Sequence, residues 1–253
     1  MAYSLSNKSN RLAHIKTNNM TNCNTLYTEK MKAADLISAD WNLLSIFERL
    51  NIKLGFGEAT VSEICARYNL STELFLIICS IYSFENYQPK TDTLKKEDLP
   101  HILSYLRASH KHYMTNSFPR LHNHIHIMME EYEDTNRYIL NKFYDDYDSE
   151  IKKHFEYEEF SVFPYIENLL NGNNEEIYKI SNFEDNHTNV DEKLNDLKNI
   201  IIKYLPGTYT SNIRMKVLNE IFKIESDLRK HTMVENKLLI PLVTKLEKRY
   251  GRK

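Results

Sequence analysis

One five-residue pattern occurs twice in the chain, and it constrains the fold more than any other feature. A histidine is followed four residues later by a glutamate at His154 and Glu158, and again at His231 and Glu235. Residues four apart lie on one face of an α-helix, so each pattern points an imidazole and a carboxylate the same way. Iron, manganese and zinc accept such ligands. The repeat therefore predicts a metal site inside a bundle of helices.

The spacing of four histidines fits one level of an up-down-up-down bundle: His110, His154, His187 and His231. The midpoints between consecutive members fall in the polar stretch 130–136, beside Gly172, and beside residues 206–207. Glycine and proline at the last two places favour turns. We therefore expect four antiparallel helices that carry these histidines at one height, with Glu158 and Glu235 one turn away.

Apolar residues recur with helical spacing along most of the chain, which predicts an all-α fold. Five glycines and six prolines are few for 253 residues, and this favours long helices over a β-sandwich or barrel. The four helices of the bundle are expected at residues 99–131, 135–170, 176–204 and 210–248.

Prolines inside three of these helices predict kinks, because proline removes a backbone hydrogen bond. The first kink is expected near Pro119. Pro164 and Pro241 each follow a glutamate of the repeated pattern by six residues. The second and fourth helices should therefore bend alike just past the metal site.

Composition along the chain divides it into four parts. Residues 1–30 are polar and rich in Asn, Ser and Thr, which is typical of a flexible tail. Apolar residues return in 31–88, which we interpret as a small helical domain. Residues 89–98 are charged and contain a proline, as expected of a linker, and 99–253 form the predicted bundle.

Six of the ten histidines lie between residues 101 and 126, and they cannot all serve one site. At 1.5 Å per residue, His122 and His124 would lie about 18–21 Å along a helix from His110. His110 fits better because its midpoint with His154 is polar, whereas the midpoint of His124 and His154 is apolar. We expect His122, His124 and His126 to lie outside the set of primary ligands.

Charge and cysteine content restrict the class of protein. The net charge of −2 gives no indication of nucleic acid or an acidic membrane as partner. Cys23, Cys65 and Cys79 form no C-x2-C pair, which favours reduced thiols in the cytoplasm. No apolar run reaches the roughly 18 residues of a membrane span, and the chain does not open with a signal peptide. We expect a cytoplasmic protein without a membrane partner. A homodimer is compatible with the sequence.

Four segments resemble the hemerythrin-like di-iron domain: residues 103–110, 154–164, 182–187 and 227–241. Within that group the chain is similar to the repair-of-iron-centres family of iron–sulfur cluster repair proteins. The resemblance covers residues 31–248 and includes that family's small helical N-terminal domain, through residues 51–57 and 60–65. One departure is clear. The family's Cys-Cys pair falls at Gly55-Phe56, and only Cys65 matches a family cysteine.

This resemblance implies a hemerythrin-like four-helix bundle with six metal ligands: His110, His154, Glu158, His187, His231 and Glu235. Glu158 and Glu235 would bridge two iron ions, which an oxo or hydroxo group also joins, with manganese as the alternative metal. Positions left open on the metals would admit O2, nitric oxide or peroxide. Glu159, Asp185 and Tyr113 are candidates for the outer hydrogen bonds that anchor the imidazoles.

The function that the resemblance implies is repair of iron–sulfur clusters damaged by oxidative or nitrosative stress. Damaged iron–sulfur proteins would be the partners, and the chain would act as a metal-binding repair or iron-donor protein rather than as a turnover enzyme. A sensor or scavenger of O2, nitric oxide or peroxide is the alternative. Residues 59–71 also resemble the first part of a helix-turn-helix, but the would-be recognition helix at 73–79 has no Arg or Lys for DNA.

Overall fold

The computed structural model describes residues 27–130, 132–173, 178–186, 190–206 and 212–250, without the side chains of residues 184–192. The chain divides into two compact units, Met1–Thr93 and Leu94–Lys253. Within the described residues both units are helical and contain no strand, apart from one isolated bridge between Lys32 and Thr60. The prediction of an all-α fold with a helical bundle after an N-terminal helical region is confirmed.

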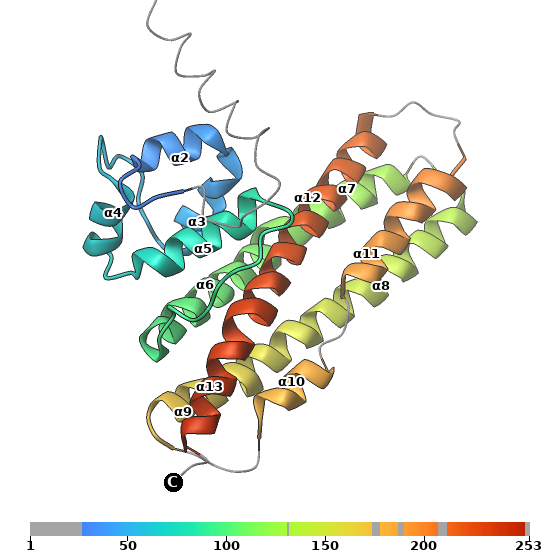
Figure 1. Ribbon diagram of the computed structural model, residues 1–253. Coiled ribbons are helices and arrows are strands. Elements are labelled where there is room, and N and C mark those ends of the chain that lie inside the picture. The colour runs from blue at the N-terminus through green and yellow to red at the C-terminus, as the bar shows by residue number, and fades with distance from the viewer. Residues whose placement is uncertain (1–26, 131, 174–177, 187–189, 207–211, 251–253) are drawn as a thin grey trace, which may run out of the picture. The chain divides into compact units, whose positions relative to one another are not determined.

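The larger unit contains four long bundle helices that run side by side (Figure 1). Bundle helix 1 consists of α6 (Leu99–His112), η3 (Tyr113–Ser117) and α7 (Phe118–Met129), after the short turn η2 (Lys96–Asp98). Bundle helix 2 consists of α8 (Asp134–Tyr157), η4 (Glu158–Val162) and α9 (Phe163–Leu170). Bundle helix 3 consists of α10 (Ile180–Asn186), α11 (Val190–Asn199) and η5 (Ile200–Tyr204). Bundle helix 4 consists of α12 (Asn212–Val234), η6 (Glu235–Leu239) and α13 (Ile240–Tyr250).

The bundle closes because each long helix packs against two others. α7 contacts α8 and α12, and α11 contacts the same two helices from the other side. Apolar side chains from all four helices fill the space between them, including the fully buried Leu121, Tyr147, Leu197 and Ile221. Burying a side chain of this size stabilises the fold by about 1.5–3 kcal/mol. Along the bundle axis, this core lies beside the level of the two His–Glu patterns: it includes residues before them on helices 2 and 4 and residues after His110 on helix 1.

A π-helical segment occurs in each bundle helix: η3, η4 and η6 interrupt helices 1, 2 and 4, and η5 ends helix 3. A backbone N–H there donates to the carbonyl five residues earlier, for example from Phe163 to Glu158 and from Ile240 to Glu235. The sequence predicted that helices 2 and 4 bend just past the site. Wide turns begin at the two glutamates themselves, because the following proline cannot join an α-helical turn and the disturbance extends back toward them, and the bend itself stays a prediction.

The N-terminal unit contains α2 (Ala33–Ala39), η1 (Trp41–Leu43), α3 (Leu44–Arg49), α4 (Val61–Arg67) and α5 (Thr72–Ser83). Side chains start the last two helices. Thr60 and Glu63 form a capping box at α4, and the hydroxyl of Ser71 accepts from the N–H of Leu74 at α5. Tyr27 is buried and donates to Ser83, although residues 1–30 are predicted as a tail; residues 1–26 lie outside the described part.

We expect the two described thiols to react slowly in the native protein. Cys65 and Cys79 are fully buried, and burial raises the pKa of Cys65 to about 11 and that of Cys79 well above its usual range. The thiolate is the reactive form, so reactivity will rise as the pH approaches 11. In a Cys23→Ser variant at pH 8, an aromatic disulfide reagent should label neither thiol until denaturant is added. Two rapidly labelled thiols would contradict the burial.

Among the described residues, no single helix is long and apolar enough to cross a membrane. α4 and α5 reach the required length and composition only as a pair, and they are bent by 119°. Residues 74–82 of α5 are all buried, as those of a core helix would be.

Candidate metal centre

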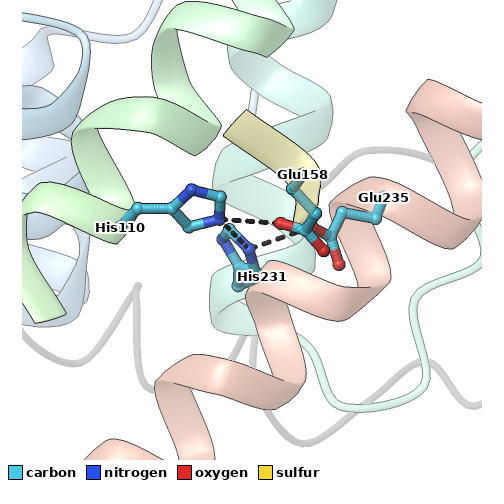
Figure 2. Close-up of side chains that lie close together, drawn as sticks. All are labelled: His110, Glu158, His231 and Glu235. Atoms are coloured by element: carbon cyan, nitrogen blue, oxygen red, sulfur yellow. Dashed lines mark hydrogen bonds and ion pairs between the residues drawn. The ribbon is translucent and has the colours of Figure 1, made fainter. Parts of the chain in front are cut away.

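Four side chains of the repeated patterns and of bundle helix 1 come together inside the bundle (Figure 2). His110 comes from α6, Glu158 begins η4, His231 comes from α12 and Glu235 begins η6. All four are buried, and one ligand atom from each lies within 4.8 Å of the others. We call this group the candidate metal centre.

The distances inside the group suit ligands of one ion. Nε2 of His110 lies 2.9 Å from Oε2 of Glu158 and 3.2 Å from Nε2 of His231. Nε2 of His231 lies 3.0 Å from Oε1 of Glu235. Metal–nitrogen bonds are about 2.0–2.1 Å, so two ligands at a right angle lie about 3 Å apart. The donors could therefore close around an ion with small movements.

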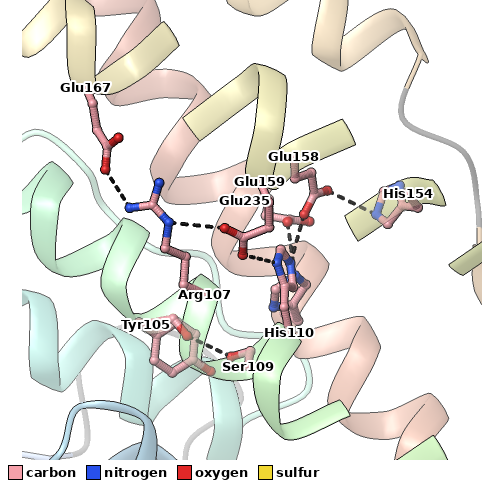
Figure 3. Close-up of polar contacts among 10 residues, drawn as sticks. Tyr105, Arg107, Ser109, His110, His154, Glu158, Glu159, Glu167 and Glu235 are labelled. Carbon is pink, nitrogen blue, oxygen red and sulfur yellow. Dashed lines mark hydrogen bonds and ion pairs between the residues drawn. The ribbon is translucent and has the colours of Figure 1, made fainter. Parts of the chain in front are cut away.

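Glu158 also faces a third imidazole. Its Oε1 lies 3.0 Å from Nε2 of His154, whereas its Oε2 faces His110. The carboxylate thus lies between histidines of bundle helices 1 and 2, with one oxygen directed at each (Figure 3). Glu158 is therefore the carboxylate that imidazoles from two different helices share.

The electrostatics of the group favour a cation. Glu158 and Glu235 are both fully buried, and a buried carboxylate is costly unless a positive charge or strong hydrogen bonds compensate it. Nδ1 of His231 is buried and has no hydrogen-bond partner among the described residues. Burial disfavours the charged form of His110, but the hydrogen bonds that its ring N–H groups donate to Glu158 and Glu159 outweigh this effect and raise the pKa of the imidazole to about 9.

A chain of hydrogen bonds holds His110 from outside the centre (Figure 3). Nδ1 of His110 lies 2.8 Å from Oε1 of Glu159, and Nε of Arg107 donates to Oε2 of the same carboxylate at 3.1 Å. Arg107 also donates to Glu167. A carboxylate only accepts, so Nδ1 of the imidazole carries a proton here, and Nε2 is directed inward. The ring of Phe155 stacks on His110 at 4.2 Å and fixes its plane.

Comparison with known proteins gives the family. Residues 101–243, more than half of the 253 residues, match the model of the hemerythrin HHE cation-binding domain. The chain belongs to the hemerythrin HHE family. Searches of curated proteins and of solved structures each returned no match.

The donors of this hemerythrin HHE domain fit a metal ion. Imidazole nitrogens and carboxylate oxygens are the ligands that iron, manganese and zinc take in proteins. Two carboxylates are fully buried here, and the buried Nδ1 of His231 has no hydrogen-bond partner among the described residues, so a cation would offset part of the cost of burying these groups. His110, Glu158, His231 and Glu235 would hold the ion.

The structure places five of the six predicted ligands together: His110, His154, Glu158, His231 and Glu235. His187 lies outside the described residues. Of the three predicted outer partners, Glu159 bonds His110, and the side chain of Asp185 lies outside the described part. The Tyr113 ring packs edge-on against His231, with centroids 5.8 Å apart.

The other histidines of bundle helix 1 lie apart from the described group around Glu158. His122 stacks on Tyr144 with ring centroids 5.2 Å apart, and His126 lies 3.8 Å from Glu130 on the same helix. His124 is partly buried, and its Nδ1 has no hydrogen-bond partner within the described structure. The hemerythrin HHE match does not distinguish these residues, so their exclusion from the ligand set stays a prediction.

Two members of the outer chain, Arg107 and Glu167, were missed by sequence reasoning. Glu159 and Glu167 are eight residues apart on bundle helix 2, but the wide turn η4 between them changes their relative facing, so their shared partner was not readable from the spacing. The arginine that joins them comes from another helix 52 and 60 residues away. No local pattern indicates such a pairing.

We expect Glu159→Gln to weaken metal binding without emptying the centre. The amide can present its NH2 to Nδ1 and reverse the tautomer of His110, and losing an outer carboxylate typically costs about 10–100-fold in metal affinity. Competition titration with a coloured chelator measures this change. Glu167→Gln, which touches Arg107 but not His110, is the matched control and should bind within about threefold of wild type. Equal affinities for Glu159→Gln and wild type would contradict the anchoring role.

Proposed function

We propose that this hemerythrin HHE domain binds two iron ions and that the protein supports repair of iron–sulfur clusters damaged by oxidative or nitrosative stress. The observation that carries the dinuclear assignment is the position of Glu158, whose two oxygens face different histidines, His110 and His154. His110 and His231 would complete one ion and His154 the other. His187, which the sequence predicts at the same height along the bundle axis, would supply the remaining imidazole.

Iron fits the donor set better than zinc does. Structural and catalytic zinc sites use three or four protein ligands, whereas six side chains are assigned here. Imidazole and carboxylate ligands suit iron, and also manganese, which stays the alternative. Bound iron would supply coordination positions for O2, nitric oxide or peroxide, and an ion that can leave for a damaged cluster.

A cavity of about 410 Å³ beside His110 supports the approach of small molecules. Its lining includes three basic side chains, two carboxylates and three apolar side chains: Arg107, Lys111, Lys152, Glu156, Glu159, Met114, Phe155 and Phe160. The basic side chains outnumber the acidic ones, and the apolar side chains would admit uncharged gases. The cavity touches His110 and Glu159, so a ligand there would reach the outer edge of the centre.

The metal assignment is tested by counting. The protein purified without added metal, and after anaerobic loading with iron(II), should contain about two ions per chain, because six ligands exceed the need of one zinc ion. Oxidised protein should show near-ultraviolet charge-transfer bands of oxo-bridged iron. One zinc ion per chain without such bands would overturn the assignment.

The repair role is tested with an iron–sulfur enzyme inactivated by nitric oxide or peroxide. Iron-loaded protein should restore its activity, whereas metal-free protein and an iron-incubated Glu158→Ala variant should not. Wild-type iron content together with recovery no better than a no-protein control would leave metal binding intact and reject repair.

A second function has an observation in its favour. Gly55 and Phe56 stand where the repair family has paired cysteines, and Gly55 adopts φ 91°, a conformation that a cysteine would rarely take. A chain without those thiols could bind O2, nitric oxide or peroxide as a sensor or scavenger. Reading DNA through α5 has less support, because residues 74–82 are buried and a recognition helix must expose side chains to bases.

A further inference from the structure

The four π-helical segments of the bundle share one relation to proline. Each begins six residues before a proline, in the pairs Tyr113 and Pro119, Glu158 and Pro164, Ile200 and Pro206, and Glu235 and Pro241. Two of the four begin at the carboxylates of the candidate metal centre. We propose that Pro164 and Pro241 are positioning residues for that centre, because they maintain the wide turns that aim Glu158 and Glu235. The inference rests on the proposed metal site.

Proline explains why a wide turn forms at these places. In an α-helix, residue 164 would donate its N–H to the carbonyl of Phe160, but proline has no N–H and its ring clashes with that carbonyl. The structure instead closes the turn one residue later, through the bond from Phe163 to Glu158. Segments of π-helix are rare otherwise, so a specific cause is required. Pro241 stands in the same relation to the bond from Ile240 to Glu235.

The wide turn sets how the two halves of bundle helix 2 face the interior. One half carries His154 and Glu158, and the other carries the fully buried Phe163 and Ile166. An α-helical turn has one residue fewer, and its formation would rotate one half against the other by about 100°. Glu158 could then not stay between His110 and His154 while Phe163 and Ile166 remain packed.

Bundle helix 4 has the same division. His231 and Glu235 belong to the half before the bond at Ile240, and the buried Leu242 and Val243 belong to the half after it. If the wide turn were lost, Leu242 and Val243 could stay packed only if His231 and Glu235 turned away from the centre. The two prolines therefore act on the centre through the backbone, without touching the metal.

The test replaces Pro164, Pro241 or both by alanine and titrates the metal-free protein with cobalt(II), whose visible bands report coordination. Each single variant should lose at least tenfold in cobalt affinity, and the double variant more. Thermal unfolding of the metal-free protein should give a melting temperature equal to or above wild type, because alanine favours helix where proline opposes it. General damage to the fold would lower both quantities together.

Pro206→Ala is the matched control, because its π-helical segment begins at Ile200 and ends bundle helix 3, so among the described residues no further half of that helix follows whose packing could be set against a ligand. It should keep cobalt affinity within twofold of wild type. A crystal structure of the metal-free double variant should show the N–H of Val162 donating to the carbonyl of Glu158. Wild-type affinity in the double variant, or an equal loss in Pro206→Ala, would overturn the proposal while leaving the metal site in place. A wild-type chain that binds no cobalt and no iron would instead reject the metal site, and the positioning role with it.

Discussion

Glu158→Gln will empty the metal centre while leaving the metal-free fold intact. Glu158 is fully buried and its oxygens face His110 and His154, so one substitution removes the group shared by both halves of the centre. The loss in affinity should exceed the roughly 10–100-fold that removal of an outer partner costs. Metal present at 100 times its dissociation constant stabilises a protein by about 2.7 kcal/mol, and the variant should lose this increment.

Metal analysis and thermal unfolding with and without iron measure both effects. Glutamine has nearly the same shape as glutamate but does not pair with a protonated His110, so the metal-free melting temperature is measured separately and the increment that metal adds decides the result. Glu156→Gln, an exposed position on the same helix, is the control and should keep wild-type metal content. Two ions per chain in Glu158→Gln would remove Glu158 from the ligand set.

His110→Ala should release metal, and free imidazole should restore it. His110 is 4% exposed and contributes an inward Nε2, and the cavity of about 410 Å³ touches it from outside. Its removal leaves a gap beside Phe155 that opens toward solvent, which an imidazole molecule could occupy. Iron content should fall in His110→Ala and recover in part at millimolar imidazole.

His124→Ala is the comparison for this experiment. His124 lies on the same bundle helix, and its buried Nδ1 has no hydrogen-bond partner in the described region, unlike the ring nitrogens of His110. Its removal should leave iron content at the wild-type level with or without imidazole. If His124→Ala empties the site and His110→Ala does not, the ligand of bundle helix 1 has been assigned at the wrong height along the bundle axis.

The features that sequence predicted are those set by local spacing. A histidine and a glutamate four residues apart must share a helix face, so the pairs at His154 and His231 were readable without a fold. The midpoint rule then selected His110 from a crowded set, and the structure places it 2.9 Å from Glu158. The helix limits followed from turn residues such as Gly172.

The remaining features depend on contacts between distant segments. Arg107 reaches Glu159 and Glu167 from another helix, and the register of the bundle decides which carboxylate it meets. The prolines indicated a disturbance, but sequence does not tell a kink from a wide turn. Whether a kink or a wide turn forms depends on which backbone conformation keeps Phe163 packed while Glu158 faces the interior of the bundle.

Complete burial of Glu158 and Glu235 has a kinetic consequence for any role as an iron donor. A chelator or a client cluster cannot touch a metal held by these carboxylates until the surrounding helices separate. Iron release would then proceed at the rate of this opening and would become independent of acceptor concentration once the acceptor is in excess. The rate of iron release would therefore be set by local opening of the protein and not by the affinity or concentration of the acceptor.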